Sequence, residues 1–356
     1  MAVPKIGRLL RRKSRFALAL MLATALVAGA AVTAALAGGT HRQLTSVNVR
    51  MDFFAAGYHS AFYVAKAKGW YAKEGLDVTI DEGQGSSSTA QLVASGKETF
   101  GFISPVAMIQ TIAGGGHLKM IFDLHQKDGS GVLVPVGRGI TQPKDLEGKT
   151  CAISPFGYIH QLLPAFFAKT GVDPSKVKLI TLGFDALIPS VAAGKVDADC
   201  EALAWGEPIS FKTLYNLDII FMSFAKYGVG PPGHGIVVNT DFLAANPSVV
   251  KAFLRATLKG YRYESDNPQA AVQILDSSVN KAFNTAAGDV AILKRSKQLW
   301  VVANTKGKPL GWMNRTNWIN VVHLMTQYMH LSPAPGLDQL FTNDYVPGWK
   351  GNPLPK

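Results

Sequence analysis

The amino-acid sequence predicts an α/β protein of two lobes, each a mostly parallel sheet flanked by helices. Two observations support this fold class. Short apolar runs alternate with helical stretches in two separate parts of the chain, and such alternation favours parallel strands joined by right-handed crossovers. The chain has 356 residues, 47% of them hydrophobic, which is enough for two packed cores rather than one.

The first alternating stretch runs from Thr45 to Thr111. Gly75 fits the position just after a helix, where a residue without a side chain ends the helical turn. The predicted elements are a strand over Val47–Phe54, a helix over Ser60–Glu74, a strand over Leu76–Ile80, a helix over Ser88–Ser95 and a strand over Thr99–Ile103.

The same rhythm restarts later, which favours a second lobe over one long sheet. Its predicted elements are strands over Lys149–Ile153, Val177–Thr181 and Asp197–Leu203, and helices over Tyr158–Thr170 and Ala186–Ala193. Gly129–Gly139 and Gly235–Asn239 are expected to be extended crossings between the lobes. The C-terminal part is expected to be helical and to pack on the first lobe, with helices over Lys251–Tyr263, Gln269–Leu275, Gly288–Val302 and Trp312–Leu331. Lobe I is therefore predicted at 45–127 and 242–356, and lobe II at 128–241.

The N-terminal segment has the pattern of an export signal. Six Lys and Arg residues precede an apolar run from Phe16 to Ala37, which ends in Ala35-Leu36-Ala37. A basic region, an apolar region and small residues at the end are typical of a signal peptide. We expect residues 1–37 to be cleaved after Ala37 and the rest to be periplasmic. The alternative is an uncleaved anchor, because 22 apolar residues can span a hydrocarbon core of about 30 Å.

Charge and cysteine content limit the partners. The formal net charge of +12 falls to +6 without the six basic leader residues, and no Lys/Arg run follows the leader. We therefore expect no nucleic-acid partner. Cys151 and Cys200 show neither a zinc pattern nor a reactive-thiol signature, so they are either small core residues or a disulfide formed after export.

Nothing in the sequence favours catalysis. It contains no His-x-x-x-His or Cys-x-x-Cys spacing and no Gly-x-Ser-x-Gly elbow, and its eight histidines are scattered. We expect no catalytic residue, no metal and no cofactor.

The turns that follow the predicted strands are the expected binding site, because ligands in open parallel sheets bind beyond the carboxyl ends of the strands. Rings there can stack on a heterocycle, helix-start N–H groups and hydroxyls can hydrogen-bond it, and a carboxylate can accept from its amino groups. The candidate ligand-binding residues are Phe53, Phe54, His59, Gly85, Ser86, Ser87, Ser104, Ser154, Phe156, Gly157, Glu201 and Trp205.

Some of these candidates have a structural alternative. His59 can cap the helix that follows it, and Trp205 can belong to the core. A capping box of Ser88 with Gln91 explains the Gly85–Ser88 segment without a ligand. Glu207 is expected to be solvated.

Several motifs resemble one known family. They are Asp52-Phe53-Phe54, His59–Ala65, Lys68–Tyr71, Glu74–Val78, Pro143–Lys149, Ala193–Ala198, Asn246–Phe253 and Phe341–Tyr345. In this order they resemble the solute-binding proteins of ABC transporters for nitrate, sulfonate, taurine and thiamine-pyrimidine precursors. The resemblance covers nearly the whole chain after the leader. It implies a type II periplasmic-binding-protein fold and a monomeric receptor that closes on a small-molecule ligand and docks on an ABC permease in the inner membrane.

The resemblance leaves the ligand open. Phe53, Phe54, Trp205 and Glu201 favour a thiamine-related aminopyrimidine, since related pyrimidine receptors stack an aromatic ring on their ligand. A sulfonate, nitrate or another organic anion is the alternative, although no Arg lies at the expected turns. A thiamine-pyrimidine-synthase-like enzyme is the third hypothesis, but related fungal synthases carry a cysteine-rich run that this chain lacks.

Overall fold

The computed structural model describes residues 43–280 and 284–348. The predicted signal peptide and its cleavage site lie outside these residues. Within them, no helix is both long and apolar enough to cross a bilayer.

The first sheet has five strands in the order β2-β1-β3-β10-β4. β1 pairs in parallel with β2 and β3, and β10 runs antiparallel between β3 and β4. β3 and β10 are buried along their whole length, as expected for central strands covered on both faces. The strands are β1 (Thr45–Arg50), β2 (Leu76–Asp81), β3 (Phe100–Ile103), β4 (Leu118–Asp123) and β10 (Gly235–Asn239).

The second sheet repeats this plan in the order β7-β6-β8-β5-β9. β6 pairs in parallel with β7 and β8, and β5 runs antiparallel between β8 and β9. The strands are β5 (Ser130–Pro135), β6 (Thr150–Ile153), β7 (Lys178–Thr181), β8 (Ala198–Leu203) and β9 (Ile219–Ser223). The expected crossings are therefore strands: Gly129–Gly139 contains β5, and Gly235–Asn239 is β10, which belongs to the first sheet.

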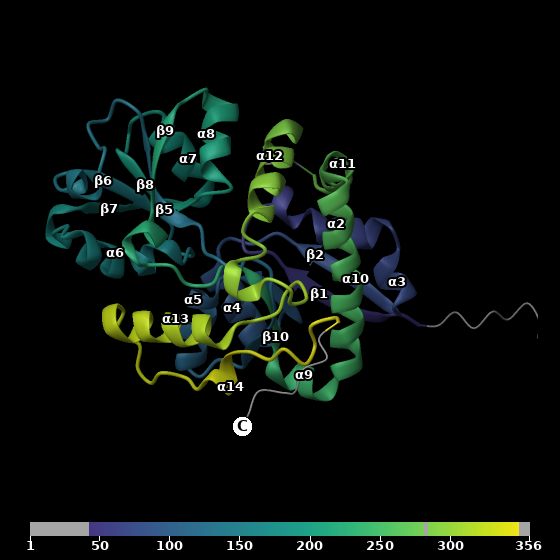
Figure 1. The fold of residues 1–356 in the computed structure, drawn as a ribbon. Coiled ribbons are helices and arrows are strands. Elements are labelled where there is room, and N and C mark those ends of the chain that lie inside the picture. Colours follow the sequence, from purple (N-terminus) through teal and green to yellow (C-terminus); the bar gives the residue numbers. More distant parts are fainter. Residues whose placement is uncertain (1–42, 281–283, 349–356) are drawn as a thin grey trace, which may run out of the picture. The chain divides into compact units, whose positions relative to one another are not determined.

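Helices flank both sheets, as Figure 1 shows. The first sheet with its helices is lobe I, and the second sheet with its helices is lobe II. The residue bounds given above for the two lobes stay a prediction. Lobe I has α2 (Ser60–Ala67), α3 (Trp70–Lys73), α4 (Ser86–Ala94), α5 (Pro105–Ala113), α9 (Thr240–Ala245), α10 (Pro247–Asp266) and α11 (Pro268–Ser278). Lobe II has α6 (Leu163–Thr170), α7 (Phe184–Ala192) and α8 (Glu207–Tyr215). The chain ends with α12 (Ala286–Lys297), α13 (Arg315–Tyr328) and α14 (Leu337–Leu340). Short 3-10 helices lie between these elements: η1 (Gly57–His59), η2 (Pro143–Leu146), η3 (Ile159–Leu162), η4 (Pro174–Lys176), η5 (Phe224–Tyr227) and η6 (Ala303–Thr305).

The long helix α10 shows how the C-terminal part holds lobe I together. Pro247 occupies its first turn, and Asn267-Pro268 ends it. Its apolar face packs on α2 so closely that a Cβ on Gly260 would lie 2.1 Å from the carbonyl oxygen of Ala61. Phe253 stacks on Phe100 of β3 at a ring-centroid distance of 4.0 Å.

The structure corrects some predicted element bounds. The helix predicted over Ser60–Glu74 is two helices, because Gly69 adopts a left-handed conformation (φ 66°) between α2 and α3. The strand predicted to reach Phe54 ends at Arg50, so Asp52 and Phe53 lie in the turn beyond it. The two cysteines, left open by the sequence, form a disulfide between β6 and β8 with a Cα–Cα distance of 5.7 Å.

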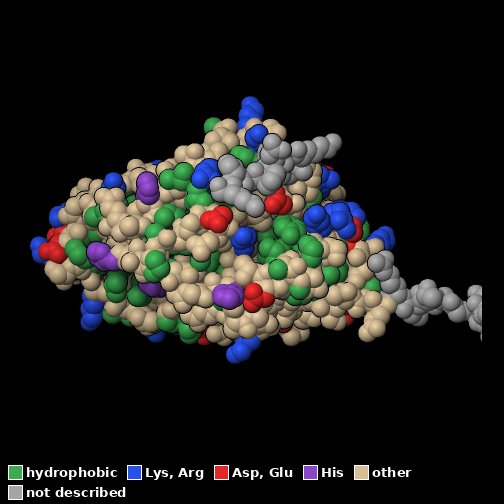
Figure 2. Space-filling model, turned by 90° about the horizontal axis from the view of Figure 1, so that it is seen from below, with side chains coloured by type: hydrophobic (Ala, Val, Ile, Leu, Met, Phe, Trp, Pro, Cys, Tyr) green, Lys and Arg blue, Asp and Glu red, His purple; other side chains and the backbone are tan. Residues whose placement is uncertain are grey.

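Charged side chains on the face drawn in Figure 2 are dispersed: Lys and Arg lie among Asp, Glu and apolar side chains. The described part of that face shows no continuous basic strip of the kind that follows a phosphate backbone.

Candidate ligand-binding site

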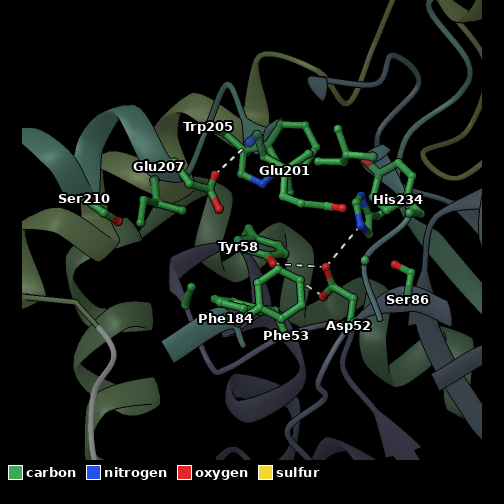
Figure 3. Close-up of a pocket in the computed structure, with 18 of the residues that line it drawn as sticks. Asp52, Phe53, Tyr58, Ser86, Phe184, Glu201, Trp205, Glu207, Ser210 and His234 are labelled. Atoms are coloured by element: carbon green, nitrogen blue, oxygen red, sulfur yellow. Dashed lines mark hydrogen bonds and ion pairs between the residues drawn. The ribbon is translucent and has the colours of Figure 1, made fainter. Parts of the chain in front are cut away.

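A cavity lies where the carboxyl ends of strands from both lobes meet (Figure 3). Its volume is about 50 Å³, which holds a few water molecules at most. Its polar lining consists of Asp52, Ser86, Glu201, Glu207, Ser210, His234 and Asn284. Its rings are Phe53, Tyr58, Tyr158, Phe184 and Trp205, and the rest of the lining consists of Ala56, Gly85, Gly157, Ile159, Leu203, Gly206 and Ile292. No Lys or Arg lines this cavity among the residues that the structure describes.

Asp52 stands just beyond β1 and is held by two histidines. Its Oδ1 lies 2.8 Å from His59 Nε2 and its Oδ2 lies 3.1 Å from His234 Nε2, while Tyr58 donates its hydroxyl to the carboxylate at 3.2 Å. Burial alone would raise the pKa of Asp52, but the charge and hydrogen bonds of His234 and His59 outweigh it and hold the pKa below its usual range. Asp52 is therefore an ionised carboxylate that already accepts hydrogen bonds from His59 and Tyr58.

His59, a predicted ligand contact, does not line the cavity. Its side chain is buried, and its Nδ1 accepts the backbone N–H of Ala56 at 3.2 Å, so Nε2 carries the proton donated to Asp52. The structure therefore places His59 behind Asp52, where it orients the carboxylate.

Glu201 lies near the carboxyl end of β8 and is 4% exposed. Its Oε1 accepts the backbone N–H of His160 at 3.1 Å and pairs with His160 Nδ1. A Cβ on Gly157 would lie 2.3 Å from Oε2, so any larger residue there would force this carboxylate to move. The backbone N–H of Glu201 is donated at 2.8 Å to Asp199 Oδ1, which fixes the strand at this point.

Glu207 was expected to be solvated, and that expectation is wrong. It is the first residue of α8, it is partly buried, and it lines the cavity. Its Oε2 accepts the backbone N–H of Leu203 at 2.8 Å. Burial raises the pKa of Glu207 to about 7, and the charges of Glu201 and Asp52 add to the increase. This carboxyl group therefore changes charge near neutral pH.

The rings form two groups. Trp205 is fully buried, and it stacks on His125 with a centroid distance of 4.5 Å; its indole N–H has no partner among the described residues. On the other side of the cavity, Phe53 meets Phe184 edge-on at 4.6 Å (Figure 3). The cavity thus offers flat apolar walls beside its carboxylates.

The start of α4 contacts lobe II rather than open space. Gly85 (φ 134°) and Ser86 line the cavity, but Ser87 does not. The backbone N–H of Ser87 is donated to the Phe156 carbonyl at 3.1 Å, and the Ser87 hydroxyl to the Gly157 carbonyl at 2.9 Å. A helix start whose N–H groups were expected to be available to a ligand therefore hydrogen-bonds the other lobe.

A second contact between the lobes lies on the α8 side of the cavity. Ser210 donates its hydroxyl to Asn284 Oδ1 at 2.8 Å. α12 follows Asn284 and contacts both η1 and α8. The cavity thus lies between two sets of hydrogen bonds that join the lobes.

Ser104 also lies away from the cavity lining. Its hydroxyl accepts the Val106 N–H at 3.2 Å and so caps α5, and its own N–H is donated to Ser86 Oγ at 3.1 Å. The structure gives Ser104 a capping role.

Three predicted residues, Phe54, Ser154 and Phe156, line a neighbouring pocket instead, which we call the outer pocket. Its volume is about 290 Å³, and Gln84, Pro155, Gly183, Phe184 and Asp185 complete its lining. The predicted site residues therefore divide into cavity lining (Phe53, Gly85, Ser86, Gly157, Glu201, Trp205), outer pocket (Phe54, Ser154, Phe156) and supporting positions (His59, Ser87, Ser104).

Sequence reasoning missed several residues of the cavity. Asp52 could have been found, since it follows a strand as the candidates do. Phe184 was missed because the helix was expected to begin two residues later, at Ala186. His234 lies in the segment before β10 and carries no local signal that would place it beside Asp52.

Comparisons with known proteins agree with this architecture. A family model described as NMT1/THI5 like matches residues 56–271, more than half of the chain. The riboflavin-binding protein RibY of Chloroflexus aurantiacus is 27% identical over 328 residues, covering 90% of this chain and 91% of the relative. The formylaminopyrimidine-binding protein of Halalkalibacterium halodurans is 25% identical over 280 residues, covering 78% and 84%.

An enzyme also matches, over a shorter range. The 4-amino-5-hydroxymethyl-2-methylpyrimidine phosphate synthase of Schizosaccharomyces pombe is 27% identical over 221 residues, covering 57% of this chain and 60% of the synthase. Membership of the family therefore does not by itself separate binding from synthesis.

Solved structures show the fold. The alkanesulfonate-binding protein SsuA of Xanthomonas axonopodis pv. citri, solved bound to MOPS, superimposes with a TM-score of 0.64 at 13% identity, covering 84% of this chain and 98% of that one. The predicted two-lobed periplasmic-binding-protein fold is confirmed by this likeness and by the two mixed sheets. Because the family model spans more than half of the sequence, the chain belongs to the NMT1/THI5-like family.

Proposed function

We propose that this protein is the extracytoplasmic receptor of an ABC importer and that it binds a small nitrogen heterocycle with amino groups, a thiamine-related aminopyrimidine. One observation carries the proposal: the cavity combines three carboxylates, Asp52, Glu201 and Glu207, with flat aromatic walls and no Lys or Arg among its described lining residues. Carboxylates accept hydrogen bonds from amino groups, and rings stack on a heterocycle.

The three carboxylates have different roles in this proposal. Asp52 is held by His59, His234 and Tyr58, so it fixes the floor of the site. Glu201 presents Oε2 toward Gly157 while His160 holds Oε1, which leaves one oxygen for a ligand N–H group. Glu207 has one short contact, to the Leu203 N–H, and can accept a second donor or, when protonated, donate to a ring nitrogen.

A sulfonate or nitrate fits this site less well. An anion would face Glu201 without a cationic side chain in the lining, and desolvating a charge without a partner is costly. The helix start that could have bound it, at Ser87, already donates to lobe II. Two relatives in the family carry names that specify riboflavin and formylaminopyrimidine, both nitrogen heterocycles.

Ligand capture by closure of the lobes is part of the proposal. Hydrogen bonds join the lobes at Ser87 and at Ser210, and the cavity between them is too small for a heterocycle. A ligand must therefore enter an opened form and then stabilise a form closed around it.

Titration calorimetry on Glu201→Gln tests the proposed ligand class. With 4-amino-5-hydroxymethyl-2-methylpyrimidine, loss of the charged acceptor should cost about 1.5 to 3 kcal/mol, or roughly 10- to 150-fold in affinity. Taurine or nitrate, if either binds, should bind the variant equally or more tightly because a repelling charge is gone.

Glu147→Gln is the matched control. It makes the same chemical change at a residue that pairs with Lys144 on the surface of lobe II, so ligand affinity should not change. An aminopyrimidine affinity that is the same in wild type, Glu201→Gln and Glu147→Gln would overturn the proposed site.

A further inference from the structure

Phe184 separates the cavity from the outer pocket. It is the first residue of α7, and it lines both spaces. Its ring meets that of Phe53 edge-on, with the planes at 79°. Phe53 comes from lobe I and Phe184 from lobe II, so the pair forms a wall across the cleft (Figure 3).

The volumes show why this wall matters. Binding sites for small molecules are usually about 300 to 1,000 Å³, and the cavity of about 50 Å³ is far below that range. The outer pocket adds about 290 Å³ directly behind Phe184. Rotation of one side chain would thus join two spaces into a site of ordinary size.

The position of Phe184 allows such a rotation. Gly183 precedes it at the start of α7, and the Phe184 ring is only partly buried. Core rings such as Phe211, in contrast, are fully buried. A helix-start side chain that packs against one ring among the described residues can turn without disturbing the sheet.

The outer pocket differs chemically from the cavity. Its polar side chains are those of Gln84, Ser154 and Asp185, and the described residues that line it include no Lys or Arg. Ser154 accepts the Phe156 N–H at 3.3 Å, so its hydroxyl proton stays available to a ligand. This environment suits hydroxyl or cationic substituents and disfavours a phosphate.

We propose that Phe184 determines the length of the ligand: the heterocycle occupies the cavity, and a neutral polar or cationic substituent passes Phe184 into the outer pocket. This inference rests on the proposed function and specifies its ligand further. In the form closed around the ligand, a ring without a substituent has Phe184 as a wall. A ring with a substituent needs Phe184 to turn away.

Calorimetry with three probes tests the inference on Phe184→Ala. The probes are 4-amino-5-hydroxymethyl-2-methylpyrimidine as the ring alone, thiamine as a ring with a cationic substituent, and thiamine monophosphate as a ring with an anionic end. Phe184→Ala should weaken binding of the ring alone and preserve or tighten binding of thiamine, raising the thiamine-to-ring affinity ratio at least tenfold. Asp185→Lys should shift preference from thiamine toward the monophosphate.

Phe156→Ala is the contrasting variant. Phe156 is 46% exposed and lines only the outer pocket, so its loss should affect thiamine and leave the ring alone unchanged. Thermal unfolding checks that all variants fold.

The outcomes separate this inference from the proposed function. If wild type binds an aminopyrimidine but Phe184→Ala leaves the affinity ratio unchanged, the role of Phe184 is wrong and the proposed function stands. If wild type binds none of the three probes, the proposed ligand class is wrong and the inference fails with it.

Discussion

Replacing Glu207 by Gln should stabilise the ligand-free protein, and more so at high pH. Glu207 lies at the start of α8, where burial raises its pKa from 4.5 to about 7. The folded protein therefore keeps a proton that the unfolded chain has already lost between these pH values. The contribution of this group to stability is thus present below pH 4.5 and is lost as pH rises toward 7 and beyond.

The magnitude follows from the size of this shift. One pKa unit corresponds to 1.36 kcal/mol, so ionised Glu207 destabilises the folded protein by at most about 3 kcal/mol at pH 8. The pKa of Asp199 is also raised, first by burial and then by the charge of Glu207, so removing that charge should also ease the ionisation of Asp199. Gln retains an oxygen for the Leu203 N–H, so the substitution removes the charge and keeps the hydrogen bond.

Urea denaturation at pH 4.5 and pH 8 measures the effect. Glu207→Gln should exceed wild type in unfolding free energy at pH 8 and match it within about 0.5 kcal/mol at pH 4.5. Glu147→Gln serves as control, because Lys144 lowers the pKa of Glu147 and its loss should not stabilise at either pH. An equal gain at both pH values, or none at pH 8, would refute the reasoning.

Three further substitutions test the ligand contact of Glu201, the disulfide and the hydrogen bonding between the lobes. Gly157→Ala should abolish tight ligand binding with little loss of stability, because the new Cβ would displace the Glu201 carboxylate, 2.3 Å away; calorimetry and thermal unfolding measure both. Changing Cys151 and Cys200 to Ala removes a crosslink over a separation of 49 residues and should lower the unfolding free energy by up to about 4 kcal/mol in urea. Ser87→Ala removes a hydrogen bond between the lobes worth about 0.5 to 1.5 kcal/mol, so small-angle scattering should show a larger ligand-free radius of gyration.

Each of these three expectations has an outcome that would contradict it. Unchanged affinity in the Gly157 variant would mean that Glu201 does not contact the ligand. A cysteine variant with the same unfolding free energy as the oxidised wild type would show that the disulfide does not stabilise the fold. An unchanged radius of gyration would mean that Ser87 does not help to hold the lobes together.

Most of the fold could be predicted from the sequence because its pattern is local. Alternating apolar runs and helical stretches specify the strands and crossover helices, as in Leu76–Ile80, which became β2 with little change. The predicted helix bounds were wrong where the backbone conformation of a single residue ends a helix. Gly69 is such a residue, because its left-handed conformation splits one predicted helix into two. β10 looked like a linker because a short apolar run carries no sign of which sheet it will join.

The site was predictable only in part, for a different physical reason. Glu201 and Gly157 were chosen because they lie at or after the ends of predicted strands, and both line the cavity, because a strand end fixes where its next side chains lie. A position at a strand end does not show whether a side chain lines the cavity or supports a residue that does. His59 and Ser104 were predicted to contact the ligand, but His59 hydrogen-bonds Asp52 and Ser104 caps α5. His234 meets Asp52 through pairing of distant segments, 182 positions apart in the numbering, and no local pattern encodes that contact.

Native mass spectrometry of the freshly purified protein tests the proposed function most directly, because a receptor closed on its ligand would retain it. We expect a retained mass that corresponds to a nitrogen heterocycle with amino groups, absent from Glu201→Gln and present in Glu147→Gln. A retained sulfonate, nitrate or other small anion, held equally by wild type and Glu201→Gln, would contradict the claim that carboxylates select the ligand.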